Sequence, residues 1–114
     1  AMAVVGADPV VMLEGPVPAT AEALRKAGVN SEQLDVIEVN EAFAPVPLAW
    51  AKNFTSGSLD KVNVNGGALA LGHPLGGTGC KLMVTLMHEL QRRKGRYGLL
   101  AICEGAGTAN ATLI

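Results

Sequence analysis

Aromatic residues make up only 4% of this 114-residue chain, and its basic residues do not outnumber its acidic ones. Nine Lys and Arg against ten Asp and Glu give a formal net charge of −1. The sequence therefore lacks the electrostatic footprint of a nucleic-acid-binding protein and the basic patch of a membrane-surface protein. Neither nucleic acid nor a membrane is expected as a partner.

Long apolar runs and cysteine clusters are also missing. No apolar run approaches the ~18 residues of a membrane span, and no charged segment precedes an apolar core at the N-terminus. The two cysteines, Cys80 and Cys103, have no framework spacing, which suits a reducing compartment better than a disulfide-rich secreted fold. We expect a cytoplasmic protein without a metal site.

Apolar residues are abundant, at 49% of the chain. A chain of this length and composition can form a single domain, residues 1–114, with a substantial core. Strand-like runs open the sequence at residues 1–5 and close it at residues 112–114. We therefore expect the domain to be part of a longer protein.

Hydrophobic periodicity predicts an α/β fold with the order β-α-β-α-β-loop-α-β-β. Strands are expected at residues 2–13 (kinked at 6–9), 36–39, 62–64, 97–103 and 108–114. Helices are expected at residues 19–27 and 45–54. A third helix is expected along the apolar stripe of residues 82–90, and it should end at Gly95. The last two strands are joined so closely that they must be antiparallel neighbours. The expected result is a mixed five-stranded sheet with helices on its faces.

Six glycines surround His73 within residues 63–79. Glycine permits positive φ or close approach of the backbone to a ligand, and Pro74 biases His73 toward an extended conformation. Histidine titrates near neutral pH, so the pattern favours a catalytic or ligand-binding loop. The alternative is a glycine-rich turn with an incidental histidine. A phosphate-binding P-loop is weaker still, because the lysine that it needs is missing.

Two further residues follow predicted strands. Cys103 precedes Gly105 and Gly107, whose N–H groups could meet an oxyanion, although a free cysteine is more commonly a small buried apolar residue. Asn40 could serve a site or simply cap a helix or an Asx-turn. With His73, both lie at the predicted carboxyl ends of strands, where α/β sheets gather their sites. We therefore expect the three side chains to converge.

Four sequence blocks now suggest a family. Residues 40–43 (Asn-Glu-Ala-Phe), 63–68 (Asn-Val-Asn-Gly-Gly-Ala), 72–74 (Gly-His-Pro) and the Cys-x-Gly-x-Gly pattern from Cys103 resemble successive signatures of the thiolase family. The similarity covers essentially the whole chain and matches only the C-terminal half of such enzymes. It implies one half of a duplicated α/β fold and acyl transfer between acyl-CoA thioesters, by Claisen condensation or thiolysis, in fatty acid metabolism.

The resemblance also implies roles for individual residues. His73 would activate a nucleophilic cysteine and donate to a thioester oxyanion. Cys103 would be the acid/base at the carbon next to the carbonyl. Asn40 would fix a water that completes the oxyanion site with His73, and the Gly105 N–H would serve a second oxyanion site. Imidazole and thiol groups can both be tuned toward the neutral pKa that such proton transfers require.

The resemblance further assigns the coenzyme A contacts to Gly66, Gly67 and Gly72, with CoA thioesters as substrates and no separate cofactor. The nucleophile would come from an N-terminal thiolase half, and the full-length protein would be a homodimer or homotetramer. Cys80 matches no family motif and is interpreted as structural. A non-catalytic thiolase-like binding or assembly subunit remains the alternative.

Two positions depart from the family pattern. Ala106 stands where a glycine is usual, so a positive φ there would cost of order 1 kcal/mol. Glu104 places a carboxylate beside Cys103, where a negative charge would raise the thiol pKa. If a second half is missing, an apolar face should also be exposed on this domain.

Overall fold

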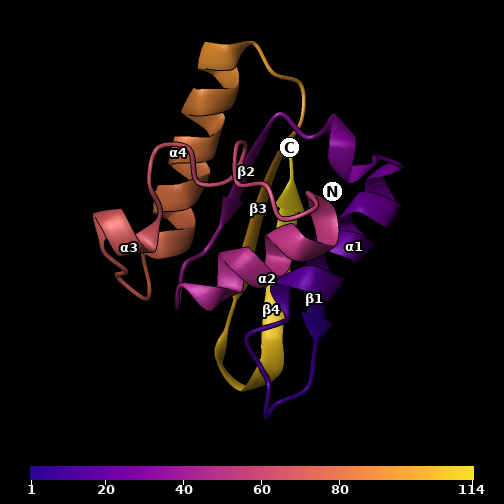
Figure 1. Ribbon diagram of the computed structural model, residues 1–114, viewed down its shortest axis with the longest axis vertical. Helices are drawn as coiled ribbons and strands as arrows, with labels where there is room; N and C mark the ends of the chain where they lie inside the picture. Colours follow the sequence, from indigo (N-terminus) through magenta and orange to yellow (C-terminus); the bar gives the residue numbers. More distant parts are fainter.

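The computed structural model of the protein describes residues 1–114 and forms a mixed, four-stranded α/β sheet (Figure 1). The strands are β1 (Met2–Gly6), β2 (Val36–Val39), β3 (Gly98–Cys103) and β4 (Thr108–Leu113), in the spatial order β1-β4-β3-β2. Strands β2 and β3 are parallel, whereas β4 pairs antiparallel with both β3 and β1. The predicted antiparallel pairing of the last two strands is confirmed.

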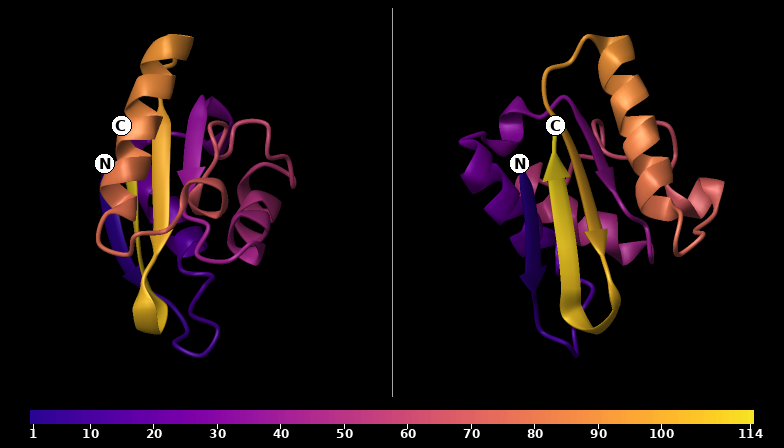
Figure 2. Two further views of the ribbon diagram at one scale, coloured as in Figure 1. Left: turned by 90° about the vertical axis from the view of Figure 1, so that its left-hand side faces the viewer. Right: turned by 180° about the vertical axis from the view of Figure 1, so that it is seen from behind.

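Helices cover the two faces of the sheet unequally (Figure 2). The helices are α1 (Pro16–Ala27), α2 (Pro45–Phe54), α3 (Ala68–Leu71) and α4 (Thr78–Arg93), with single 3₁₀ turns at Ser31–Gln33 and Gly105–Gly107. Helices α1 and α2 pack on one face, and α4 packs on the other. No helix combines the length and the apolar character needed to cross a bilayer.

The larger core lies between the sheet and helices α1 and α2. Trp50 of α2 is fully buried there, and its indole N–H donates to Thr20 Oγ1 of α1 at 2.8 Å. On the other face, Leu82 and Leu86 of α4 form a smaller cluster with two residues of the sheet, Val36 and Leu100. The site described below lies at the edge where this smaller layer ends.

The first predicted strand is wrong beyond Gly6, where β1 ends. The Asp8 carboxylate accepts hydrogen bonds from the backbone N–H groups of Val10 and Val11, which closes a turn. Met12 then takes a positive φ of 38°. The apolar residues of this segment therefore belong to a loop, and periodicity alone did not reveal the aspartate-capped turn.

The predicted strand at residues 62–64 is also wrong, and this reduces the sheet from five strands to four. Only an isolated bridge forms, between Ile37 and Val62. Asn63 has a φ of 50°, and its side-chain amide bonds both the N–H and the C=O of Val39. The side chain thus replaces the backbone partner that a continuing strand would supply.

Helix predictions were more accurate. Helix α2 spans the predicted residues, and Gly28 caps α1 in the left-handed conformation, with φ of 66°. Helix α1 begins at Pro16, three residues earlier than predicted, because proline is tolerated in a first turn. Helix α4 ends at Arg93 with Lys94 as the left-handed cap, in place of the predicted Gly95. Helix α3 was not predicted within the glycine-rich segment.

Some of the exposed apolar side chains lie on the α4 side of the sheet, and others, such as Phe43 and Leu48, lie elsewhere. Met2 and Val4 of β1 point away from the core that contains Ala3, and they are 70% and 72% exposed. On α4, Val84 and Met87 are also exposed. Met87 therefore does not belong to the buried stripe in which the sequence pattern placed it.

Candidate active site

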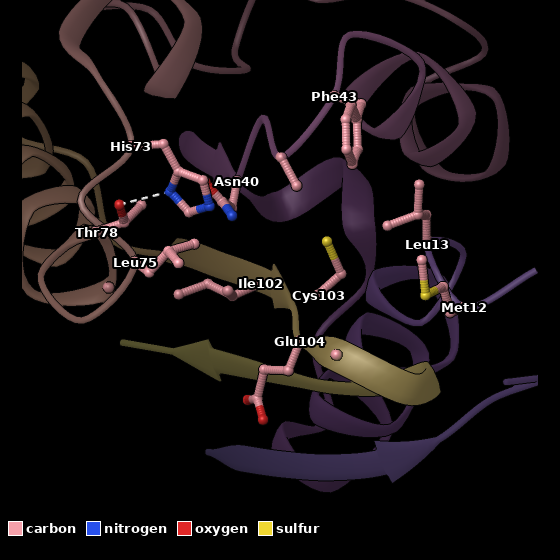
Figure 3. Close-up of a pocket in the computed structure, with 13 residues that line it drawn as sticks. Met12, Leu13, Asn40, Phe43, His73, Leu75, Thr78, Ile102, Cys103 and Glu104 are labelled. Carbon is pink, nitrogen blue, oxygen red and sulfur yellow. Dashed lines mark hydrogen bonds between the residues drawn. The ribbon is translucent and has the colours of Figure 1, made fainter.

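A pocket of about 430 Å³ opens where β2 and β3 end (Figure 3). All four residues with an expected chemical role line it: Asn40, His73, Cys103 and Gly105. In Figure 3 the His73 imidazole and the Asn40 amide face the same space as the Cys103 sulfur. The parallel pairing of β2 with β3 brings two of the three contributing segments to one edge, as expected for α/β sheets.

His73 is exposed in the pocket, and its orientation is fixed by Thr78 in the first turn of α4. The Thr78 hydroxyl donates its only proton to the Pro74 carbonyl oxygen at 2.9 Å. It must therefore accept from His73 Nδ1, which lies 2.7 Å from the hydroxyl oxygen. The proton of the neutral imidazole thus sits on Nδ1, and Nε2 carries a free lone pair. The ring is set up to accept a proton at Nε2.

Cys103 ends β3 and is only 8% exposed. Burial raises the pKa of the thiol, and the nearby Glu104 carboxylate raises it further. The Glu104 carboxylate accepts a hydrogen bond from Asn110 Nδ2 of β4 at 2.5 Å, and this bond fixes the position of the carboxylate. The thiol is therefore the dominant form of Cys103 at neutral pH in the free protein.

Asn40 extends β2 by one residue, its backbone N–H donating to the Ala101 carbonyl at 2.9 Å. The side chain is 1% exposed, and neither its Oδ1 nor its Nδ2 has a hydrogen-bond partner in the protein. Helix α2 begins beyond it, with Ala44 as the N-cap, so Asn40 does not cap that helix. Its amide remains available to bind something else.

The glycine-rich segment is fastened to β2 by Glu41 and Asn63. One Glu41 carboxylate oxygen accepts from Asn63 Nδ2 at 2.9 Å, and the other accepts from the Leu69 N–H at 2.8 Å. A Cβ on Gly67 would lie 2.5 Å from the Glu41 carboxyl carbon. The absence of a side chain at this position therefore leaves the space that the Glu41 carboxylate occupies. Neither Gly67 nor the other two glycines assigned to coenzyme A, Gly66 and Gly72, lines the pocket. A CoA contact by these glycines stays a prediction.

Comparisons with known proteins agree with this architecture. The family model for the thiolase C-terminal domain matches residues 1–114. The chain belongs to the thiolase family. It is 58% identical over 108 residues to the steroid 3-ketoacyl-CoA thiolase of Mycobacterium tuberculosis, covering 95% of this chain and 26% of that protein. It is 50% identical over 109 residues to the human mitochondrial 3-ketoacyl-CoA thiolase, covering 96% of this chain and 27% of that protein.

Solved structures give the same assignment. The crystal structure of human mitochondrial 3-ketoacyl-CoA thiolase superimposes with a TM-score of 0.93 and 48% identity, covering 98% of this chain and 28% of that one. A structure of the same human enzyme in complex with CoA matches equally well. The thiolase domain described here therefore spans about a quarter of the length of these relatives.

The turn after Cys103 contains the two departures of this thiolase domain from its family pattern. Ala106 does adopt a positive φ, of 56°, and Gly107 follows with φ of 81°. A Cβ on Gly107 would lie only 2.6 Å from the Ala7 carbonyl oxygen. A glycine is therefore essential at position 107, whereas position 106 tolerates alanine at the cost of strain.

We expect Gly107→Ala to lower the free energy of unfolding by about 3 kcal/mol, because it adds both a steric clash and backbone strain. The matched variant Ala106→Gly should change it by less than about 0.5 kcal/mol, since relief of strain is offset by greater unfolded-state entropy. Urea denaturation of both variants measures the difference. Equal stabilities would contradict the close packing of the turn against residues 7–8.

Sequence reasoning missed Thr78 and the apolar wall of the pocket. Thr78 is buried beneath His73 and was hidden by the glycine-rich context, its only signal being a hydroxyl five residues after the histidine. The wall comes from distant segments, which periodicity cannot bring together. Its apolar side chains are Met12, Leu13, Ala42, Phe43, Leu75 and Ile102.

Proposed function

We propose that this domain is the C-terminal catalytic half of a thiolase that transfers acyl groups between CoA thioesters. The observation that carries the proposal is the arrangement of His73, whose Nδ1 is held by Thr78 while Nε2 is free in the pocket shared with Cys103 and Asn40. Family membership supports the reaction class, and the CoA complex of the human relative supports an acyl-CoA ligand.

In this proposal His73 first acts as a base. Its Nε2 takes the proton of a nucleophilic cysteine thiol supplied by the N-terminal half, and the thiolate attacks the acyl carbonyl carbon. The protonated Nε2 then donates to the oxyanion, together with a water held by Asn40. The unpartnered amide of Asn40, at the pocket wall, suits it to hold that water. The Gly105 N–H would serve a second oxyanion.

Cys103 would exchange a proton with the carbon next to the carbonyl. In thiolytic cleavage, the bond between the α- and β-carbons breaks, and its electron pair forms an enolate on the departing acyl-CoA. The Cys103 thiol then protonates that carbon and becomes a thiolate. Condensation runs the same step in reverse. A raised thiol pKa keeps the proton available for cleavage and makes the thiolate a strong base for condensation.

The proposal extends to the whole protein: the N-terminal thiolase half as the covalent partner domain, and a cytoplasmic homodimer or homotetramer as the assembly. The exposed apolar side chains of β1 and α4 support a partner on that side of the sheet. The second candidate is a non-catalytic binding or assembly module. The strained Ala106 and the carboxylate of Glu104 beside Cys103 are the observations that favour it.

We expect the longer protein that contains this domain to catalyse thiolysis of acetoacetyl-CoA, and the isolated 114-residue chain to show none. Neither cysteine of the chain is suited to be the nucleophile. Cys80 is exposed on α4 and does not line the pocket, and the raised pKa of Cys103 keeps it protonated.

The measurement is the loss of acetoacetyl-CoA in the presence of CoA, with both proteins at equal concentration. Thiolysis by the isolated chain that disappears in Cys80→Ser would make Cys80 the nucleophile. If the longer protein binds acyl-CoA without cleaving any 3-ketoacyl-CoA, the binding module is the correct function.

A further inference from the structure

Glu38 and Asn40 are two buried polar side chains on β2 beneath α4, and Glu38 lies outside the pocket. Strand side chains alternate between faces, so Val36, Glu38 and Asn40 share the α4 face of β2. Val36 indeed packs in the cluster with Leu82 and Leu86, and the β3 partner of Glu38, Leu100, belongs to the same cluster. Glu38 is therefore one strand repeat, about 7 Å, behind Asn40.

Neither side chain has a protein partner. Glu38 is 0% exposed, and both of its carboxylate oxygens lack a hydrogen bond, as do Oδ1 and Nδ2 of Asn40. Leaving buried polar groups unpaired is costly, and such groups are normally satisfied by ordered water when no side chain is in reach. Two unsatisfied groups on one strand face, separated by a single repeat, are placed to share one water.

The charges around Glu38 favour its neutral form. The pKa of Glu38 is raised to about 7, mainly by burial and further by the negative charges of Glu41 and Glu89. Lys81 of α4 opposes it, but the Lys81 ammonium donates to the Gly72 carbonyl oxygen. A neutral carboxylic acid carries one donor and one acceptor, whereas the ionised form only accepts.

We propose that Glu38 is a positioning residue for Asn40: a buried water joins the two side chains, and the acid form of Glu38 fixes the direction in which the Asn40 amide faces the pocket. The inference rests on the proposed function, because it gives Asn40 its water-holding task. When Glu38 ionises, it loses its donor and places a negative charge behind an oxyanion site. Activity should therefore fall as the pH rises through the Glu38 titration.

The test uses three variants of the longer protein. Glu38→Gln keeps a neutral donor and acceptor, so kcat should stay within about 3-fold of the original and its decline above neutral pH should disappear. Glu38→Leu removes both groups and should lower kcat by about 10- to 100-fold with little change in KM. Leu86→Met, a volume-conserving change in the same buried layer, should leave kcat unchanged.

Infrared difference spectra between the original protein and Glu38→Gln provide a readout that needs no turnover. A protonated carboxyl band should be present below pH ~6 and absent above pH ~8, and Asn40→Leu should shift its frequency. If the longer protein is inactive but its carboxyl band still shifts in Asn40→Leu, the proposed function is refuted and the link between Glu38 and Asn40 is supported. An active enzyme in which Glu38→Leu has normal kcat, or in which Asn40→Leu leaves the band in place, would overturn the inference.

Discussion

Replacing His73 with alanine in the longer protein should lower kcat/KM for acyl transfer by about 10³- to 10⁴-fold. Two contributions are lost together: the base that generates the thiolate, and the donor that faces the thioester oxyanion. The Nδ1 bond to Thr78 leaves only Nε2 available, so this one atom carries both tasks and its removal abolishes both. Single-turnover acylation by an acyl-CoA should slow by a similar factor, because this step precedes carbon–carbon bond formation or cleavage.

Thr78 provides the graded control. Thr78→Val removes the hydroxyl that accepts from Nδ1 while keeping the shape of the side chain, and we expect an intermediate loss of about 10- to 100-fold. Thr78→Ser keeps the hydroxyl and should remain within about 3-fold. If Thr78→Val is fully active, the imidazole does not depend on this contact for its tautomer. If His73→Ala acylates normally, His73 is not the activating base.

Replacing Cys103 with alanine should separate the two halves of the reaction. Turnover in either direction should fall by about 10³-fold or more, because the proposed mechanism gives the proton transfer at the α-carbon to Cys103 alone. Of the other ionisable groups that line the pocket, His73 serves the nucleophile in this proposal, and Glu104 is bonded to Asn110. Acylation of the nucleophile should continue at a rate close to the original, since that step uses His73. The variant should therefore accumulate acyl-enzyme from acetyl-CoA.

Intact-protein mass spectrometry after mixing with acetyl-CoA measures this accumulation directly. Exchange of the α-protons of acetyl-CoA with deuterated water should be lost in Cys103→Ala and retained in Cys80→Ser, which alters the exposed cysteine on α4. Normal α-proton exchange without Cys103 would show that another group performs the transfer. Loss of acylation as well would mean that Cys103 also contributes to thiolate formation.

Hydrophobic pattern was sufficient for the elements that bury a regular face. Helix α2 and strands β2, β3 and β4 all have such a face, and they were located to within a residue. The two strand predictions that failed share a physical cause: a side chain takes over the role of a backbone partner. Asp8 ends β1 by binding two backbone N–H groups, and Asn63 bonds the edge of β2 where a fifth strand was expected.

The residues carried by recognisable sequence blocks were predicted, and those that matter only through their contacts in the fold were not. Asn40, His73 and Cys103 follow strands or stand among glycines, so their positions stood out. Thr78 matters through the two hydrogen bonds of its hydroxyl, and Glu38 matters because its carboxylate has none. In a sequence, a threonine and a glutamate at these positions would more commonly be ordinary helix-start and strand residues. Thr78 gains its role from the contact with His73, and Glu38 from its burial on β2 beneath α4.

The Glu41 carboxylate ties the segment that carries His73 to the sheet on one side through Asn63 and on the other through the Leu69 amide. A free loop with so many glycines would explore a wide range of conformations, and each residue ordered on ligand binding would cost about 1–2 kcal/mol in entropy. Here that entropy is lost during folding, before any ligand binds. Binding energy from the substrate is then left for the reacting atoms, which is the advantage of a preorganised site.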